Sequence, residues 1–75
     1  MSAYSPIKAV DRSRDCFLKL PEVIARTALS RTSIYRKVDR GEFPKPQRLG
    51  ANSVAWYESD VIAWIEAPLE WKAAA

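Results

Sequence analysis

Hydroxyl and guanidinium side chains recur along residues 31–40, where a helix would place several of them on one face. Ile34 and Val38 follow helical spacing and would face the core. The side chains that would then point away from the core are Thr32, Ser33, Arg36 and Arg40. Arginine can donate two hydrogen bonds to guanine O6 and N7, and threonine or serine can contact a thymine methyl or a base edge. The face therefore has the chemistry of a major-groove recognition helix, with a merely solvated basic helix as the alternative.

Three further side chains flank this face: Arg31 and Tyr35 on one side and Lys37 on the other. Arg31 would occupy the first helical position, where the helix dipole disfavours a cation by about 0.3–1 kcal/mol. A phosphate at the same terminus would remove that conflict, because the free backbone N–H groups and the guanidinium would bind it together. The first turn therefore favours an anionic partner.

A second polar group surrounds a turn further along the chain. Residues 47–49 and 54–57 are short β-prone runs on either side of 50–53, which predicts a β-hairpin, or wing. The polar residues of this wing are Lys45 and Arg48 on the approach and Asn52 and Ser53 at the tip. Phosphate contact, or insertion into the minor groove, would suit them, and an ordinary polar turn is the alternative.

Helix signals place the first face within a two-helix unit. Pro21 suits a first turn, so a helix is expected over 21–27. Ser30 is the expected N-cap of the next helix, over 31–40, and Gly41 follows its end. Such short helices, separated by two or three residues, match a helix-turn-helix.

A third helix is expected after the wing. Ser59 would cap it, and Val61, Trp64 and Ile65 would face the core at i, i+3 and i+4 spacing. Strand alternation also places Trp56 inside. The predicted fold is mainly α with a small β-hairpin, a winged helix-turn-helix of three short helices plus the wing.

The expected organisation has three parts: a flexible N-terminal arm over 1–16, the winged helix-turn-helix domain over 17–67, and a short frayed C-terminal tail over 68–75, which contains Trp71. At 75 residues and 48% hydrophobic composition, the chain suffices for one small domain.

Composition excludes several function classes. The chain has one cysteine and no histidine, so it offers neither a disulfide nor a tetrahedral zinc set. It has no histidine base and no Gly-rich phosphate loop, so we expect no enzyme, metal or cofactor. No apolar run approaches the roughly 18 residues that span a bilayer, and no signal peptide is evident. We expect a cytoplasmic protein associated with the bacterial nucleoid.

The charge is concentrated in the centre of the chain. Residues 1–16, 17–57 and 58–75 carry +1, +5 and −3 respectively. The simplest electrostatic partner of such a centre is a polyanion, and a solvated basic face is the alternative. Together with the major-groove chemistry of residues 31–40, the charge leads us to expect double-stranded DNA as the partner, and neither a membrane nor a small-molecule substrate.

Several motifs together resemble the AlpA-like prophage regulatory proteins. The matching segments are FLKLPEVI (17–24), LSRTSIYR (29–36), GEFPKP (41–46), and Trp56 with SDV (59–61) and AWI (63–65). Members of this family are small winged helix-turn-helix proteins related to MerR-type DNA-binding domains and to phage excisionases. The resemblance implies DNA binding, with recognition-helix roles for Arg31, Thr32, Ser33, Tyr35 and Arg36 and wing roles for Lys45 and Arg48. Where the family usually ends its first helix with glycine, this chain has Ala28, which would cost about 1–2 kcal/mol in the left-handed conformation.

Three functions remain open at this stage. The first is a sequence-specific regulator of transcription in a phage or mobile element, for example of an integrase gene. The second is an excisionase that bends attachment-site DNA and assists an integrase. The third is a protein-interaction module or antirepressor that uses Leu69, Trp71 and the acidic third helix. An integrase and further copies of the chain on DNA are the candidate protein partners.

Overall fold

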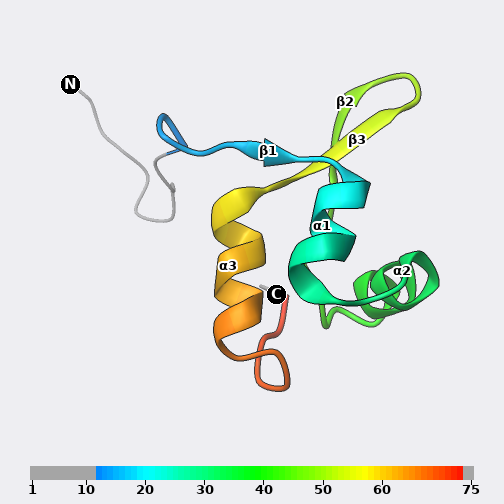
Figure 1. The fold of residues 1–75 in the computed structure, drawn as a ribbon, viewed down its shortest axis with the longest axis vertical. Helices are drawn as coiled ribbons and strands as arrows, with labels where there is room; N and C mark the ends of the chain where they lie inside the picture. The colour runs from blue at the N-terminus through cyan, green and yellow to red at the C-terminus, as the bar shows by residue number, and fades with distance from the viewer. Residues whose placement is uncertain (1–11, 74–75) are drawn as a thin grey trace.

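The computed structural model describes residues 12–73, so the first eleven residues of the arm expected over 1–16 and the last two residues of the chain lie outside the described part. In chain order the elements are β1 (Phe17–Leu18), α1 (Leu20–Thr27), α2 (Arg31–Asp39), β2 (Gln47–Gly50), β3 (Ser53–Tyr57) and α3 (Glu58–Glu66) (Figure 1). The fold is helix-rich with a small antiparallel sheet, which confirms the predicted winged helix-turn-helix class.

The sheet has the order β1-β3-β2, with β3 paired to different neighbours at its two ends. Its start forms the hairpin with β2, in which Gly50 pairs with Ser53, and its end pairs with β1, in which Leu18 faces Trp56. The hairpin was predicted, but β1 was not, because a two-residue strand has no periodicity of its own. β1 is a strand because β3 lies beside it.

Local signals set the ends of α1 and α2. Pro21 lies in the first turn of α1, and Ala28 ends the helix in the left-handed region at φ 62°, with its N–H donating to the oxygen of Ile24. The Oγ of Ser30 accepts the N–H of Ser33 at 3.1 Å and caps α2, and Gly41 follows that helix at φ 72°. The predicted caps of α2 are therefore confirmed. Ala28 adopts the conformation that glycine would hold without strain.

The cap of α3 differs from the prediction. The helix begins at Glu58, so Ser59 is its second residue and not its N-cap. The cap comes from a distant segment: Asp15 Oδ1 accepts the N–H of Ser59 at 3.1 Å, and the oxygen of Cys16 accepts the N–H of Glu58 at 2.8 Å. Sequence reasoning missed this cap because its partners are more than forty residues apart.

Residues 12–16 are consequently held against α3, although they were expected to belong to a flexible arm. The guanidinium of Arg12 lies 3.9 Å from the ring centroid of Tyr57 and donates to Asp15 at 2.9 Å. The Ser59 hydroxyl donates to the same carboxylate at 2.6 Å. The hydrogen bond from Ser59, reinforced by that from Arg12, holds the pKa of Asp15 well below its usual range.

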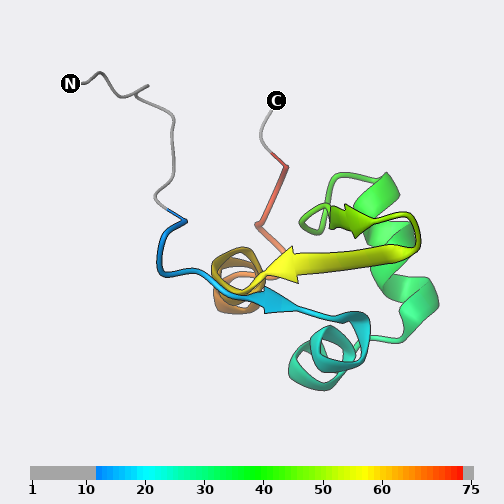
Figure 2. The same ribbon diagram turned by 90° about the horizontal axis from the view of Figure 1, so that it is seen from above.

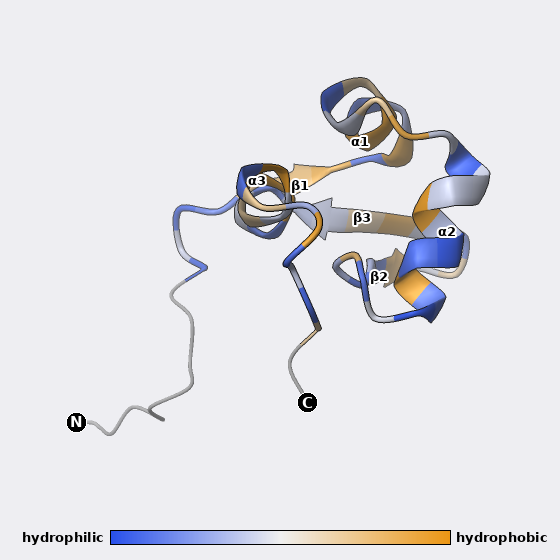
Figure 3. Cartoon of the chain, turned by 90° about the horizontal axis from the view of Figure 1, so that it is seen from below, coloured by the Kyte–Doolittle hydropathy of each residue, from blue (hydrophilic) through white to orange (hydrophobic). Residues whose placement is uncertain are grey.

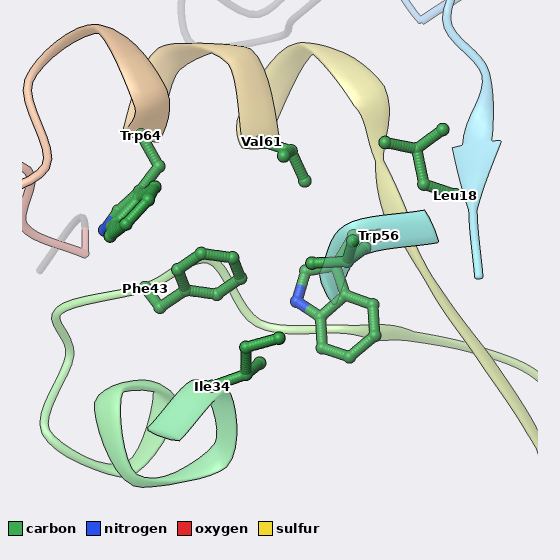
Figure 4. Close-up of a cluster of buried hydrophobic side chains, with 7 residues drawn as sticks. Leu18, Ile34, Phe43, Trp56, Val61 and Trp64 are labelled. Carbon is green, nitrogen blue, oxygen red and sulfur yellow. The ribbon is translucent and has the colours of Figure 1, made fainter. Parts of the chain in front are cut away.

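The core lies between the sheet and the three helices (Figure 4). Its buried residues are Leu18, Val23, Ile34, Phe43, Trp56, Val61 and Trp64. Burial of Trp56, Val61 and Trp64 confirms the prediction, but Ile65 is 41% exposed and the expectation for it was wrong. The buried residues of α3 are Val61 and Trp64 alone.

Aromatic rings fix the segment between α2 and β2. Phe43 is fully buried, with its ring centroid 5.1 Å from that of Trp64 and 6.4 Å from that of Trp56. The indole of Trp56 donates to the oxygen of Pro44 at 2.7 Å, and that of Trp64 donates to the oxygen of Glu42 at 3.0 Å. The loop that leaves α2 is thereby held from inside the domain.

Candidate nucleic-acid interface

The two polar groups singled out from the sequence lie on the same side of the molecule. In Figures 1 and 2, α2 and the β2–β3 hairpin are both on the right and α3 is on the left. The helix-turn-helix unit of α1 and α2 is joined to the hairpin by the loop over 40–46. One partner could therefore contact α2 and the hairpin together.

Much of α2 has hydrophilic colouring in Figure 3, interrupted by hydrophobic residues. The exposed residues of this helix and its cap include Arg31, Thr32, Arg36 and Arg40, while Ser33 and Lys37 are half-buried. Ile34 is fully buried on the opposite face. Helical periodicity thus identified Thr32, Arg36 and Arg40 correctly as exposed. Ser33, which was expected on the same face, is half-buried, and its hydroxyl accepts a bond of 3.0 Å from that of Ser30.

Tyr35 has a different position from the residues around it. Its ring is half-buried against the core, with its centroid 6.0 Å from that of Trp56. The ring therefore contributes to packing, and a contact with a ligand would involve the hydroxyl end of the side chain.

The N-terminus of α2 differs in charge from those of the other helices. Glu22 lies in the first turn of α1, and Glu58 and Asp60 lie in that of α3, where carboxylates complement the helix dipole. The first turn of α2 has no acidic residue and begins with Arg31. The backbone N–H groups of Arg31 and Thr32 have no acceptor within the helix, as at any helix start. This terminus is electropositive and would attract an anion.

Ion pairing separates the cations of the domain into two groups. Arg26 contacts Glu22 at 3.0 Å and Glu58 at 2.9 Å, and the bond with Glu58, followed by that with Glu22, raises the pKa of Arg26. Arg12 is paired in the same way with Asp15 and Asp60.

The second group has no such partners. Over residues 12–73, the cations of α2 and the loop without an ion pair or side-chain hydrogen bond are Arg31, Arg36, Lys37, Arg40 and Lys45. Their charge is available to an external anion.

Some of the predicted wing residues are exposed, and others form hydrogen bonds within the domain. Lys45 and Asn52 are exposed, whereas Arg48 donates to the oxygen of Ala51 at 3.1 Å within the hairpin. The hydroxyl of Ser53 accepts a bond of 2.7 Å from Lys19, a cation that the sequence analysis did not single out. The signal for Lys19 was its place as the one charged residue within the apolar run over 17–20.

No group of three or more His, Cys, Asp or Glu side chains is placed to hold a metal ion among residues 12–73. None of the helices in that range has the length and hydropathy required to cross a membrane.

Comparison with known proteins identifies a family that matches most of this chain. The family described as prophage CP4-57 regulatory protein (AlpA) matches residues 16–69. This match includes every helix and strand of the structure. No solved structure matches the chain.

Two curated relatives are similar over most of this chain. The uncharacterised protein ORF88 of Enterobacteria phage P4 is 44% identical over 55 residues, which are 73% of this chain and 62% of that protein. The chain thus spans less than two thirds of the length of this relative. The DNA-binding transcriptional activator AlpA of Escherichia coli (strain K12) is 34% identical over 61 residues, which are 73% of this chain and 87% of that protein.

Proposed function

Because this chain belongs to the AlpA family of prophage regulatory proteins, we propose that it is a sequence-specific DNA-binding protein of a phage or mobile element that regulates transcription. In this proposal α2 enters the major groove and the β2–β3 wing lies along the sugar-phosphate backbone. The AlpA relative, named as a DNA-binding transcriptional activator, supports the class of function.

The observation that carries the proposal is that, within the described part of the chain, the cations of α2 and Lys45 have no acidic partner, whereas most of the cations that come earlier are engaged. Over residues 12–73, the cations that precede α2 are engaged with carboxylates or, for Lys19, with a hydroxyl, apart from the exposed Arg14. Unpaired arginines and lysines gathered on one side are expected where phosphates replace protein carboxylates. A surface that only promoted solubility would have no need for this arrangement.

The proposed roles follow the position of each side chain. Thr32, Ser33 and Arg36 would contact base edges from the central face of α2. Phosphate contacts are assigned to residues at the ends and edges of the interface: Arg31, Tyr35, Lys37, Arg40, Lys45, Arg48, Asn52 and Ser53. The first N–H groups of α2 would bind the same phosphate as Arg31.

The test is selection from a random duplex library with the full chain at fixed, near-physiological salt. We expect an enriched motif, which selection with an Arg36→Ala variant would lose or relax at one base pair. Enrichment of a motif found at a promoter supports the regulator, whereas an array at the end of a mobile element would support an excisionase instead. Failure to enrich any motif, together with weak binding at low salt, contradicts DNA binding of either kind.

A further inference from the structure

The loop over 40–46 is the covalent connection between the C-terminal end of α2 and the start of β2. The relative position of α2 and the wing therefore depends on how firmly this loop is held. Trp56 and Trp64 hold it from the core side, through the oxygens of Pro44 and Glu42. Its outer side is contacted by a segment that comes from the far end of the chain.

This C-terminal segment (residues 67–73) turns back after α3. The N–H groups of Glu70 and Trp71 both donate to the oxygen of Ala67, at 3.1 and 3.0 Å. The N–H of Ala73 then donates to the oxygen of Gly41 at 2.9 Å. In Figures 1 and 2 the segment ends beside the loop that leaves α2. The tail is thus docked on the loop, although it was expected to be frayed.

Trp71 lies near residues of both α2 and the start of the wing. Its half-buried side chain packs against the core and borders two hollows. Lys37 and Glu42 line one hollow, and Lys45 and Gln47 line the other. Trp71 therefore shares one hollow with the C-terminal turn of α2 and the other with the residues that enter β2.

We propose that Trp71 is a positioning residue for DNA binding, which fixes the α2–β2 loop so that α2 and Lys45 engage one duplex at the same time. The proposal rests on the function proposed above. The family match ends at residue 69, so the contact from Trp71 and the bond from Ala73 lie beyond the part of the chain that it covers. Since Trp56 and Trp64 hold the loop independently, removal of Trp71 should loosen its outer side without unfolding the domain.

The experiment is a double-mutant cycle on the selected duplex, with Lys45→Ala and Trp71→Ala made singly and together. Trp71→Ala should weaken binding about tenfold, since loss of preorganisation at a shared contact is typically of this size. Lys45→Ala should then weaken binding by a much smaller factor in the Trp71→Ala background than in the wild type. Arg36→Ala, which removes a contact within α2 itself, should have the same effect in both backgrounds.

Two variants serve as controls for this cycle. Leu69→Ala, at a side chain that is 92% exposed, should bind as the wild type does. Trp71→Phe should restore most of the affinity, because a ring can still occupy the site. Circular dichroism and a thermal melt establish that each variant is folded at the assay temperature. If Trp71→Ala is not folded at that temperature, a chain that ends at Lys72 replaces it in the cycle. This shorter chain lacks the hydrogen bond from Ala73 to Gly41.

The proposal would be overturned if the effect of Lys45→Ala on affinity simply added to that of Trp71→Ala, or to that of the chain ending at Lys72 where it is used instead. It would also be overturned if Trp71→Ala bound the duplex with wild-type affinity. Either result would leave DNA binding by the domain intact. Failure of the wild-type chain itself to bind any duplex would instead refute the proposed function. The two failures are therefore distinguishable.

Discussion

The indole N–H of Trp56 donates a hydrogen bond of 2.7 Å to the carbonyl oxygen of Pro44, inside the core. Trp56 comes from the central strand and Pro44 from the loop that follows α2, so this bond ties the sheet to the end of the proposed recognition helix. Both residues are buried, which places the oxygen of Pro44 out of reach of bulk water.

Trp56→Phe should lower the free energy of unfolding by about 2–4 kcal/mol, because it leaves that oxygen without a donor and creates a cavity. Urea denaturation followed by circular dichroism measures the change. Trp64→Phe is the matched control, since its partner oxygen, on Glu42, is only partly buried and can recruit water. Equal losses in the two variants would contradict a special role for the Trp56 bond.

Arg36→Ala should reduce affinity for the selected duplex by about 1–3 kcal/mol and relax the preference at one base pair. Arg36 is exposed on α2 and, within residues 12–73, has no ion pair. Binding isotherms on the selected site and on single-base variants of it measure both effects. Arg14→Ala removes an exposed cation from the segment before β1 and should change neither. Equal losses from the two substitutions would mean that only net charge matters.

Lys45→Ala should weaken binding to all duplexes by a similar factor and lower the slope of log K against log salt by about one. The exposed ammonium lies at the approach to the wing, where a phosphate is the expected contact. A salt titration on selected and random duplexes gives the slope. Lys45→Arg keeps the charge and should keep the slope, so a slope reduced in both variants would argue against a simple phosphate contact.

Much of the fold could be predicted because its signals are local. The cap of Ser30 on α2, the positive φ of Gly41 and the buried face around Ile34 each depend on neighbours within a few residues. The exposed face of α2 follows from the same helical period.

The remaining features depend on partners that are distant in sequence. Phe17 belongs to a strand only because it pairs with Tyr57, and Asp15 caps a helix that starts at Glu58. Phe43 is buried because two tryptophans from other elements enclose it. The pairing of cations is partly non-local: Arg26 has a local partner in Glu22, but its bond with Glu58 joins segments that are distant in sequence.

Ala28→Gly should raise the free energy of unfolding by about 1 kcal/mol, because Ala28 lies in the left-handed region at φ 62°. Gly41→Ala should lower it by about 1–2 kcal/mol for the same reason. The added methyl at Gly41 would meet Ala73 Cβ at 3.8 Å, which is an ordinary contact. The expected loss therefore comes only from holding alanine in the left-handed backbone conformation. Urea denaturation measures both.

Ala25→Gly is the control for this pair, because Ala25 is exposed inside α1, where glycine costs about 1 kcal/mol. The two glycine substitutions in α1 and at its end should therefore act in opposite directions. If Ala28→Gly were as destabilising as Ala25→Gly, the left-handed end of α1 would be refuted.

Asp15→Asn should remove part of the acid sensitivity of the domain. Hydrogen bonds from Ser59 and Arg12 lower the pKa of Asp15 in the folded state, so the folded protein favours the ionised carboxylate more than the unfolded chain does. The resulting stabilisation is fully present above the ordinary pKa of an aspartate, about 4, and is lost as the pH falls below that value. Melting temperature measured between pH 7 and pH 2 should therefore fall less steeply in Asp15→Asn, from a lower value at pH 7.

Asp39→Asn provides the comparison, because Asp39 is exposed and, over residues 12–73, has no ion pair or hydrogen bond from its side chain. Between pH 7 and pH 2, the melting temperature of Asp39→Asn should fall as steeply as that of the wild type. Because Asp15 caps α3 from a segment before β1, protonation should release residues 12–16 from α3 before the core melts. An Asp15→Ala variant removes the cap at any pH, so hydrogen exchange at the N–H of Ser59 should be faster in this variant than in the wild type at the same pH. Equal protection in the two proteins would contradict the assignment of Asp15 as the cap.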